Sequence, residues 1–158
     1  MNKEVATFGG GCFWHIEESY RTVKGVVKTS VGYMGGHFPN PSYLDVLSRI
    51  TGHAEVAQIE FAPDLISYQQ LLDLFWSIHD PTQLNRQGSD RGEQYRSIIF
   101  YHNEQQAQEA KLSKLELEQT NTFTKPIVTL IEPASEYYLA DESHQQYIFK
   151  SKKQKIRN

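Results

Sequence analysis

The sequence predicts an α+β fold, a two-layer α/β sandwich in which helices cover a mixed β-sheet. Segments with strand and helix character alternate in the order strand–helix–strand–strand–helix–strand–helix–strand. This alternation favours helices packed against one sheet. No internal repeat and no linker divides the 158 residues. We therefore expect a single domain, residues 1–158, with a core large enough to fold unaided.

The first half of the chain supplies three of the expected strands and two of the helices. Residues 4–8 predict a short strand, and apolar positions at helical spacing within 13–20 predict a helix directly after it. Residues 23–33 and 55–61 predict the next two strands. A serine opens segment 67–79 and has the chemistry of a helix N-cap. The apolar face of that helix comprises Tyr68, Leu71, Leu72, Phe75 and Ile78.

The second half predicts two further strands and a polar helix. Residues 97–101 and 127–131 are continuous apolar runs of the kind found in central strands. Between them Asn103 begins a polar helix, and Gln106 stands at the right spacing for a capping box. Residues 150–158 are basic and poor in apolar side chains, which predicts a solvated, frayed and mobile tail.

Composition excludes several classes of protein. A net charge of −3 and a pI near 6.1 give no general attraction to nucleic acid or to a membrane surface. No apolar run approaches the ~20 residues of a spanning helix, and the first residues lack the apolar stretch of a signal peptide. One cysteine cannot form an intramolecular disulfide, so a reducing, cytoplasmic location is expected. We expect the protein to be a monomer.

The single cysteine, Cys12, lies in the sequence Phe-Gly-Gly-Gly-Cys-Phe-Trp at the predicted strand-to-helix junction. Three glycines allow a sharp turn and leave space around the sulfur. Free backbone N–H groups at a helix start favour negative charge, which predicts a lowered thiol pKa and a nucleophilic thiolate. The alternative is that Cys12 is a small buried hydrophobe, the common fate of a free cysteine. The adjacent glycines and aromatic residues favour chemistry.

Three further residues are candidates to assist the thiol. Glu55 stands at the end of the apolar row of strand 55–61, where burial would raise its pKa and keep it protonated. The alternative is a hydrated, ionised carboxylate at a frayed strand end. Tyr95 closes a polar loop before strand 97–101, and Tyr43 follows a Pro-Asn-Pro-Ser turn that would hold its phenol in place.

The histidines do not form a metal site, because none pairs with another histidine or with the cysteine at ligand spacing. His15, three residues after Cys12, is within reach of the thiol on a helix surface. Two other functions remain open from the residues. One is a cysteine hydrolase or acyltransferase with Cys12 as nucleophile and His53 as base. The other is a non-catalytic module that binds methionine-containing peptides.

The motifs together resemble the A class of peptide methionine sulfoxide reductases. The resemblance covers nearly the whole domain and keeps the family order. The matching blocks are Gly11-Cys12-Phe13-Trp14, Gly32-Tyr33-x-Gly35-Gly36, Pro39-Asn40-Pro41-Ser42-Tyr43, Thr51-Gly52-His53-Ala54-Glu55, Asp90-Arg91-Gly92-x-Gln94-Tyr95-Arg96-Ser97 and His144-Gln145-x-Tyr147.

The resemblance implies a ferredoxin-like core and a role for each site residue. Cys12 would attack the sulfoxide sulfur of methionine sulfoxide, free or in oxidised proteins, and become a sulfenic acid. Glu55 would protonate the sulfoxide oxygen. The remaining roles fall to Tyr43 and Tyr95 as hydrogen-bond donors, Asp90 as an aid to positioning, and Phe13 and Trp14 as the pocket for the S-methyl group. Selectivity for the S epimer and repair of oxidised proteins are also implied.

Two departures from the family pattern affect the expectations. His15 stands where the family usually has glycine, beside the site. Many members carry resolving cysteines in the tail, and this chain has none. The sulfenic acid would then be reduced from outside by thioredoxin, by glutaredoxin with glutathione, or by a small dithiol. No metal or tightly bound cofactor is expected.

Overall fold

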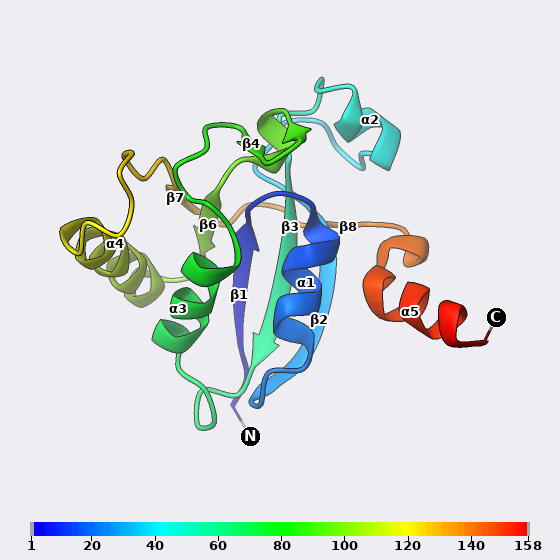
Figure 1. Ribbon diagram of the computed structural model, residues 1–158. Helices are drawn as coiled ribbons and strands as arrows, with labels where there is room; N and C mark the ends of the chain where they lie inside the picture. The colour runs from blue at the N-terminus through cyan, green and yellow to red at the C-terminus, as the bar shows by residue number, and fades with distance from the viewer. Residues whose placement is uncertain (1, 158) are drawn as a thin grey trace.

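The computed structural model describes residues 2–157 of the protein. Helices and strands alternate along the chain, with short 3₁₀ turns η1 and η2 before β6 and α5 (Figure 1). In chain order the elements are β1 (Glu4–Gly9), α1 (Phe13–Arg21), β2 (Val26–Met34), α2 (Tyr43–Leu47), β3 (Ala54–Phe61), α3 (Tyr68–Ile78), β4 (Arg86–Gln87), β5 (Asp90–Arg91), η1 (Glu93–Tyr95), β6 (Ile98–Tyr101), α4 (Glu104–Gln119), β7 (Leu130–Pro133), β8 (Tyr138–Leu139), η2 (Glu142–His144) and α5 (Tyr147–Arg157).

The main sheet has the strand order β7-β6-β1-β3-β2-β8. Within residues 2–157 the four central strands run antiparallel to one another, β8 pairs antiparallel with β2, and β7 pairs in parallel with β6. The elements β1, α1, β2, β3, α3 and β6 follow one another as a β-α-β-β-α-β unit. This unit is the ferredoxin-like arrangement. The mixed sheet and the ferredoxin-like core confirm the fold expected from the sequence.

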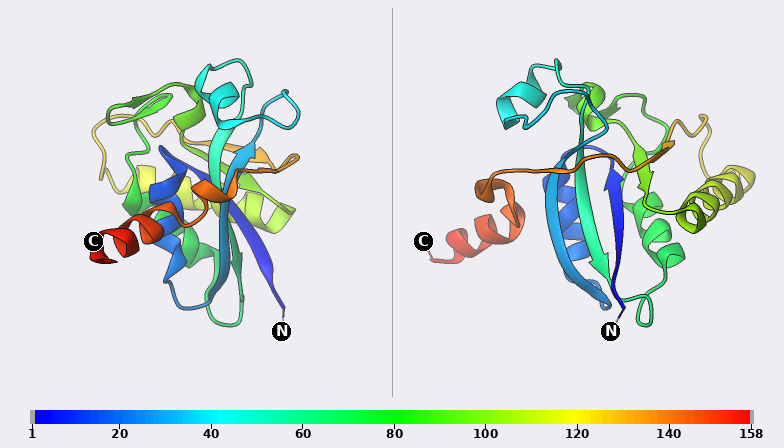
Figure 2. Two further views of the ribbon diagram at one scale, coloured as in Figure 1. Left: turned by 90° about the vertical axis from the view of Figure 1, so that its right-hand side faces the viewer. Right: turned by 180° about the vertical axis from the view of Figure 1, so that it is seen from behind.

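Helices α1 and α3 cover one face of the sheet, as Figure 1 shows. The chain between β7 and β8 crosses the opposite face as an extended segment, visible from behind in Figure 2. Helix α4 packs beside α3 and the β6–β7 edge, while α5 packs against α1 at the other side of the molecule. The helical layer and the sheet therefore meet along a single main core.

That core contains aromatic side chains in contact with one another. Phe8 on β1 stacks on Tyr20 of α1 and on Phe75 of α3, with ring centroids 5.5 and 5.0 Å apart. Alternating residues of β3 contribute Ala57, Ile59 and Phe61 to the same cluster. Glu55 is on this face as well, because it is two residues before Ala57 on the same strand.

Helix α3 begins as expected. Ser67 is its N-cap and forms a reciprocal capping box with Gln70. At α4, Asn103 accepts the N–H of Gln106, but the Gln106 side chain accepts the N–H of His102 instead of that of Asn103. The expected capping box at Asn103 is therefore only half formed.

Two expectations for the second half of the chain need correction. The strand expected at 127–131 begins only at Leu130, because the N–H of Val128 donates to Pro81 O in the loop after α3. This strand lies at the sheet edge and Leu130 is exposed, so it is not central. Instead of a frayed segment, residues 150–157 continue helix α5.

Candidate active site

The glycine turn places Cys12 at the start of helix α1. Strand β1 ends at Gly9, and Cys12 is the N-cap of α1, as expected from the sequence. Gly11 adopts a φ of +91°, which side chains rarely tolerate, and its N–H donates to Tyr95 O at 3.1 Å. A Cβ on Gly11 would lie 2.8 Å from the Gln87 side chain. The turn therefore depends on glycine and ties Cys12 to the loop that carries Tyr95.

Glu55 reaches the backbone immediately after Cys12. Its carboxyl is only 1% exposed, and Oε1 accepts the N–H of Phe13 at 3.2 Å. Its other oxygen, Oε2, is buried and has no hydrogen-bond partner among residues 2–157. The hydrated, frayed position considered from the sequence is therefore wrong, because β3 begins at Ala54 and buries Glu55.

Burial raises the pKa of Glu55 to about 8. The Phe13 N–H opposes this shift, and the negative charge of Asp90 adds to it. At neutral pH the carboxyl is mostly protonated. This agrees with the protonated carboxyl expected from the position of Glu55 in the apolar row.

The sulfur of Cys12 behaves differently from the sequence expectation. Burial raises the pKa of its thiol to about 12, and the charges of Glu55 and Asp90 raise it further. The backbone N–H groups of Trp14 and His15 do lower the pKa, as a helix start should, but burial outweighs them. The expected thiolate is therefore wrong for the free protein, which holds Cys12 as a thiol. The side chain of His15 is exposed, and only its backbone N–H is among the groups that lower the pKa of Cys12.

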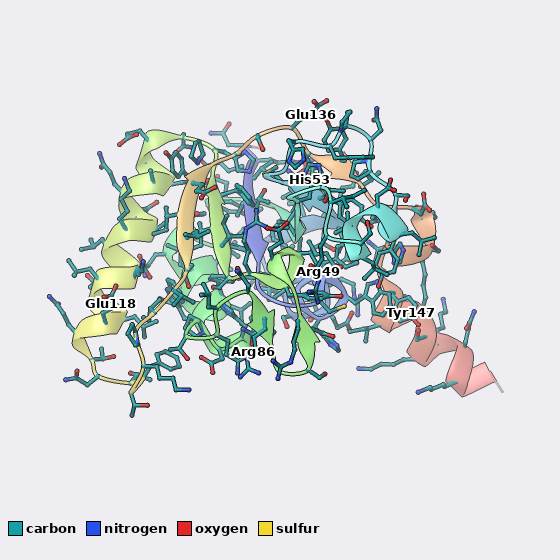
Figure 3. All side chains as sticks on the ribbon, turned by 90° about the horizontal axis from the view of Figure 1, so that it is seen from above. Arg49, His53, Arg86, Glu118, Glu136 and Tyr147 are labelled. Atoms are coloured by element: carbon teal, nitrogen blue, oxygen red, sulfur yellow. The ribbon has the colours of Figure 1, made fainter. Side chains whose placement is uncertain are left out.

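The loops at one end of the sheet bring Tyr43, Tyr95 and Asp90 to the same place. Tyr43 is the first residue of α2, Tyr95 closes η1, and Asp90 begins β5. Burial raises the pKa of both phenols, and the nearby charges of Glu55, Cys12 and Asp90 raise it further. Five candidates that are far apart in the sequence thus form one electrostatic cluster. Figure 3 shows this end of the molecule, with Arg49 and His53 on the surrounding loops and Arg86 on β4.

Tyr33 joins this cluster, although the sequence analysis gave it no role. It lies directly opposite Glu55 in the β2–β3 ladder, so both side chains occupy the same face. Its phenol oxygen is buried without a hydrogen-bond partner among the described residues. Burial and the charge of Glu55 raise its pKa. Register across the two strands, unknown from the sequence, is what brings Tyr33 beside Glu55.

The aromatic residues after Cys12 form a wall beside the sulfur. Phe13 is fully buried and packs on Tyr33 and Tyr43, with ring centroids 5.6 and 6.4 Å away. Trp14 is half-buried, and its Nε1–H donates to His144 Nδ1 at 3.1 Å. Tyr147 stacks on the Trp14 indole at 3.9 Å. The wall therefore combines the start of α1 with the C-terminal segment.

His144 and Tyr147 received no individual role from the sequence, although their block matched the family. His144 also packs on Tyr43, with ring centroids 4.5 Å apart. Burial lowers the pKa of His144, so the neutral ring can accept the Trp14 N–H. Since both residues lie some 130 positions after Trp14, only the family block, not local spacing, could have pointed to them.

Buried polar contacts hold this C-terminal segment in position. Glu17 on α1 is 1% exposed and accepts three hydrogen bonds, from Thr29 Oγ1 (2.7 Å), Gln146 N (2.8 Å) and Gln146 Nε2 (3.0 Å). The Gln145 side chain accepts the N–H of Val31 at 2.8 Å and donates to its C=O at 2.9 Å. Gln145 thus pairs with β2 as a neighbouring strand would.

His53 is unsuited to serve as the base of a hydrolase. Its ring is buried, its Nδ1 accepts the N–H of Gly36 at 2.9 Å, and its Nε2–H then donates to Phe38 O at 2.7 Å. Both ring nitrogens are occupied by backbone groups. Within residues 2–157, no three His, Cys, Asp or Glu side chains are grouped so as to hold a metal ion.

Comparison with known proteins agrees with this geometry. Residues 4–158 match the family described as "Peptide methionine sulfoxide reductase". The chain belongs to this family. The activity in the family's name, reduction of peptide methionine sulfoxide, is therefore its activity, and the hydrolase alternative is not supported.

Individual relatives place the chain in the A class. It is 67% identical over 150 residues to "Peptide methionine sulfoxide reductase MsrA 1" of Nostoc sp., an alignment that covers 95% of this chain and 92% of that protein. The crystal structure of reduced Mxr1 from Saccharomyces cerevisiae is similar with a TM-score of 0.89 and 37% identity, covering 95% of this chain and 86% of Mxr1. Mxr1 in complex with Trx2 is similar with a TM-score of 0.65 and 28% identity, covering 92% and 84%.

Proposed function

We propose that Cys12 and Glu55 together remove the oxygen of methionine sulfoxide, with Tyr43, Tyr95 and Asp90 around them. The observation that carries this proposal is the Phe13 N–H to Glu55 hydrogen bond, which fixes a protonated carboxyl beside the nucleophilic sulfur. A sulfoxide oxygen leaves poorly unless it is protonated, so an acid at this position accounts for the residue type. Phe13 and Trp14 form the apolar side that receives the S-methyl group.

The chemistry requires one proton to move from sulfur to oxygen. Glu55 Oε2 donates its proton to the sulfoxide oxygen while Cys12 loses its own proton and attacks the sulfoxide sulfur. The attack forms a bond between Cys12 Sγ and the substrate sulfur. This bond and the S–O bond then break as the hydroxyl group moves to Cys12, which leaves Cys12 as a sulfenic acid and the substrate as methionine. The proton from Cys12 restores Glu55. Because the free thiol has a pKa of about 12, Cys12 loses its proton only after the substrate binds, when Glu55 and the sulfoxide can take up that proton.

The sulfenic acid is then reduced by thiols from outside the chain. Two external thiol groups convert it back to the Cys12 thiol, with release of water and formation of one disulfide in the reductant. The chain contains no second cysteine that could resolve it. Thioredoxin is the reductant favoured by the Mxr1–Trx2 complex, with glutaredoxin and glutathione, or a small dithiol, as the alternatives.

We further propose that the protein acts in the cytoplasm as a monomer, with one catalytic domain over residues 1–158 and without a metal or bound cofactor. No helix within residues 2–157 is long and apolar enough to cross a membrane. A single cysteine that must stay reduced also favours a reducing compartment.

The proposal is tested by one turnover without reductant. The reduced protein is mixed with the S or the R epimer of methionine sulfoxide, and methionine and the intact protein mass are measured. We expect one methionine per protein with the S epimer and the mass of one added oxygen on Cys12. An unmodified thiol after methionine release, or equal reaction of both epimers, would contradict the proposal. Adding a dithiol should then restore continuous turnover.

The phenols are expected to contribute less than the carboxyl. We expect Tyr43→Phe and Tyr95→Phe each to slow oxygen removal about 10- to 100-fold, the effect of one hydrogen bond to a charged oxygen. Single-turnover rates of the two variants measure this. Tyr138→Phe is the matched control, since its hydroxyl lies on the surface and, within residues 2–157, donates only to Glu136. Unchanged rates in both site variants would remove the phenols from the chemistry.

A further inference from the structure

The basic end of the chain is a feature that the proposed chemistry leaves without a role. Residues 147–158 contain five of the sixteen Lys and Arg residues and no Asp or Glu. Residues 1–146 hold all 19 acidic residues and 11 basic ones, a net charge of −8. Positive charge is thus concentrated on helix α5 of an otherwise acidic protein. Such a segregated charge attracts an anionic partner to one place on the surface.

Helix α5 and strand β2 enclose a surface groove of about 620 Å³. Four cationic side chains line it, from three different elements of the fold. They are Arg21 of α1, Lys28 of β2, and Lys150 and Lys153 of α5. Val27 and Phe149 add apolar surface and are 47% and 41% exposed. The lining therefore suits a ligand that combines negative charge with an apolar side chain.

The cations differ in whether they already have partners. Arg21 pairs with Glu18 at 3.0 Å and Lys150 with Glu142 at 3.2 Å. Lys28 and Lys153 form no ion pair within the part of the chain that the structure describes. Phe149 is covered by two cations, with the Arg21 guanidinium 4.3 Å and the Lys153 amine 5.7 Å from its ring centroid. Lys28 and Lys153 are thus the charges available to a ligand.

The groove is joined to the active site through the first turn of α5. Gln146 lines the groove and donates twice to the buried Glu17. The next residue, Tyr147, stacks on Trp14 of the aromatic wall. Figure 3 shows Tyr147 where α5 leaves the body of the molecule. The groove therefore stands in a fixed relation to the sulfur.

We propose that this groove binds an acidic segment of the oxidised protein whose methionine sulfoxide occupies the active site. This inference rests on the proposed function and names acidic protein segments as the class of substrate that the enzyme prefers. Arg21 lies nine residues after Cys12, about 14 Å along the helix. An extended peptide covers that distance with about four residues. A long polyanion such as DNA, or a flat anionic membrane, would also meet the acidic remainder of the protein, which disfavours both.

The test compares kcat/KM for peptides that each contain one methionine sulfoxide. One peptide carries four Glu and one Phe within positions four to nine before the sulfoxide, a second carries them after it, and a third has Gln in place of Glu. Free methionine sulfoxide is the reference substrate. The variant Lys28→Glu/Lys153→Glu reverses the available charges. The matched control, Lys3→Glu/Lys111→Glu, makes the same change in net charge at exposed positions away from the groove.

At low salt we expect the wild type to prefer at least one acidic peptide over the Gln peptide by about tenfold, the combined effect of a few exposed ion pairs. The groove variant should lose this preference and the control should keep it. Salt at 0.5 M should weaken it, because exposed charges are screened. All three proteins should reduce free methionine sulfoxide equally.

Failure of the inference is separable from failure of the proposed function. If free methionine sulfoxide is reduced but acidic and Gln peptides react equally at low salt, the groove proposal is wrong and the reductase chemistry stands. A preference that survives charge reversal in the groove would also overturn it. Binding of anionic vesicles or duplex DNA through Lys28 and Lys153, without any peptide preference, would assign the groove to a different partner. Absence of reaction with free methionine sulfoxide would instead overturn the proposed chemistry.

Discussion

Replacement of Cys12 by serine is expected to abolish turnover of methionine sulfoxide while leaving the protein folded. A serine hydroxyl has the same shape but is a far weaker nucleophile than sulfur, and it cannot form a sulfenic acid. Cys12 is half-buried at the N-cap of α1 and makes no side-chain cap hydrogen bond. Serine is itself a favoured N-cap residue, so we expect unfolding free energies within about 1 kcal/mol of wild type.

The measurement is methionine formation with the S epimer and excess dithiol, with substrate binding followed in parallel by calorimetry. We expect retained binding and no methionine above the uncatalysed background. Residual turnover that depends on the protein would show that another group accepts the oxygen. Ser48→Ala, at the C-cap of α2, is a control for small changes near the site loops.

Replacement of Glu55 by glutamine is expected to slow oxygen removal by about 10²–10⁴-fold, the contribution of a positioned general acid. The amide oxygen can still accept the Phe13 N–H, so the turn around Cys12 is preserved. Glutamine has no acidic proton to transfer to the sulfoxide oxygen. The rate is measured as methionine released in a single turnover, with binding measured separately. A wild-type rate in this variant would remove Glu55 from the mechanism.

The same substitution should change how stability depends on pH. Glu55 has a pKa near 4.5 when exposed and about 8 in the folded protein, because burial penalises its charge. Between these values the folded state binds a proton that the unfolded state lacks, so wild-type stability falls as pH rises. The cost of ionising Glu55 reaches on the order of 5 kcal/mol above pH 8. Glutamine cannot ionise, and the variant should avoid this loss.

Urea unfolding of both proteins at pH 5, 7 and 9 measures the effect. We expect the stability advantage of Glu55→Gln to grow from pH 5 to pH 9. Parallel pH profiles would show that the carboxyl is not buried as a neutral acid. The oxygen-removal rate of the wild type should also fall above about pH 8 as the carboxyl loses its proton.

Local patterns predicted the elements that build the site. The glycines before an apolar helix predicted the turn at Cys12. The alternation of residues in β3 predicted on which face of the sheet Glu55 lies. Expectations were less accurate where distant contacts decide the structure. The run at 127–131 enters the sheet late because Val128 pairs with Pro81, and α5 is ordered against α1 by contacts from Glu17. Neither partner can be identified from spacing along the chain.

The chemistry of the site was predicted in part. Burial of Glu55 follows from its place in an apolar row, and its raised pKa follows from burial. The prediction of a lowered pKa for the Cys12 thiol was wrong, because the sequence shows the helix start but not how deeply the sulfur is buried. The position of Tyr33 beside Glu55 depends on strand register. The contact of His144 with Trp14 depends on the fold of the C-terminal segment. These are properties of the assembled structure.

The protonated state of Cys12 determines how the sulfur reacts with oxidants in the cell. Hydrogen peroxide, the kind of oxidant that makes methionine sulfoxide, reacts with thiolates and only slowly with thiols. With a pKa of about 12, nearly every free molecule presents the unreactive form. Because this chain has no second cysteine, an oxidised Cys12 cannot form an internal disulfide that would prevent its further oxidation. In the proposed mechanism Cys12 keeps its proton until methionine sulfoxide binds, which protects the sulfur from the oxidant that produced the substrate.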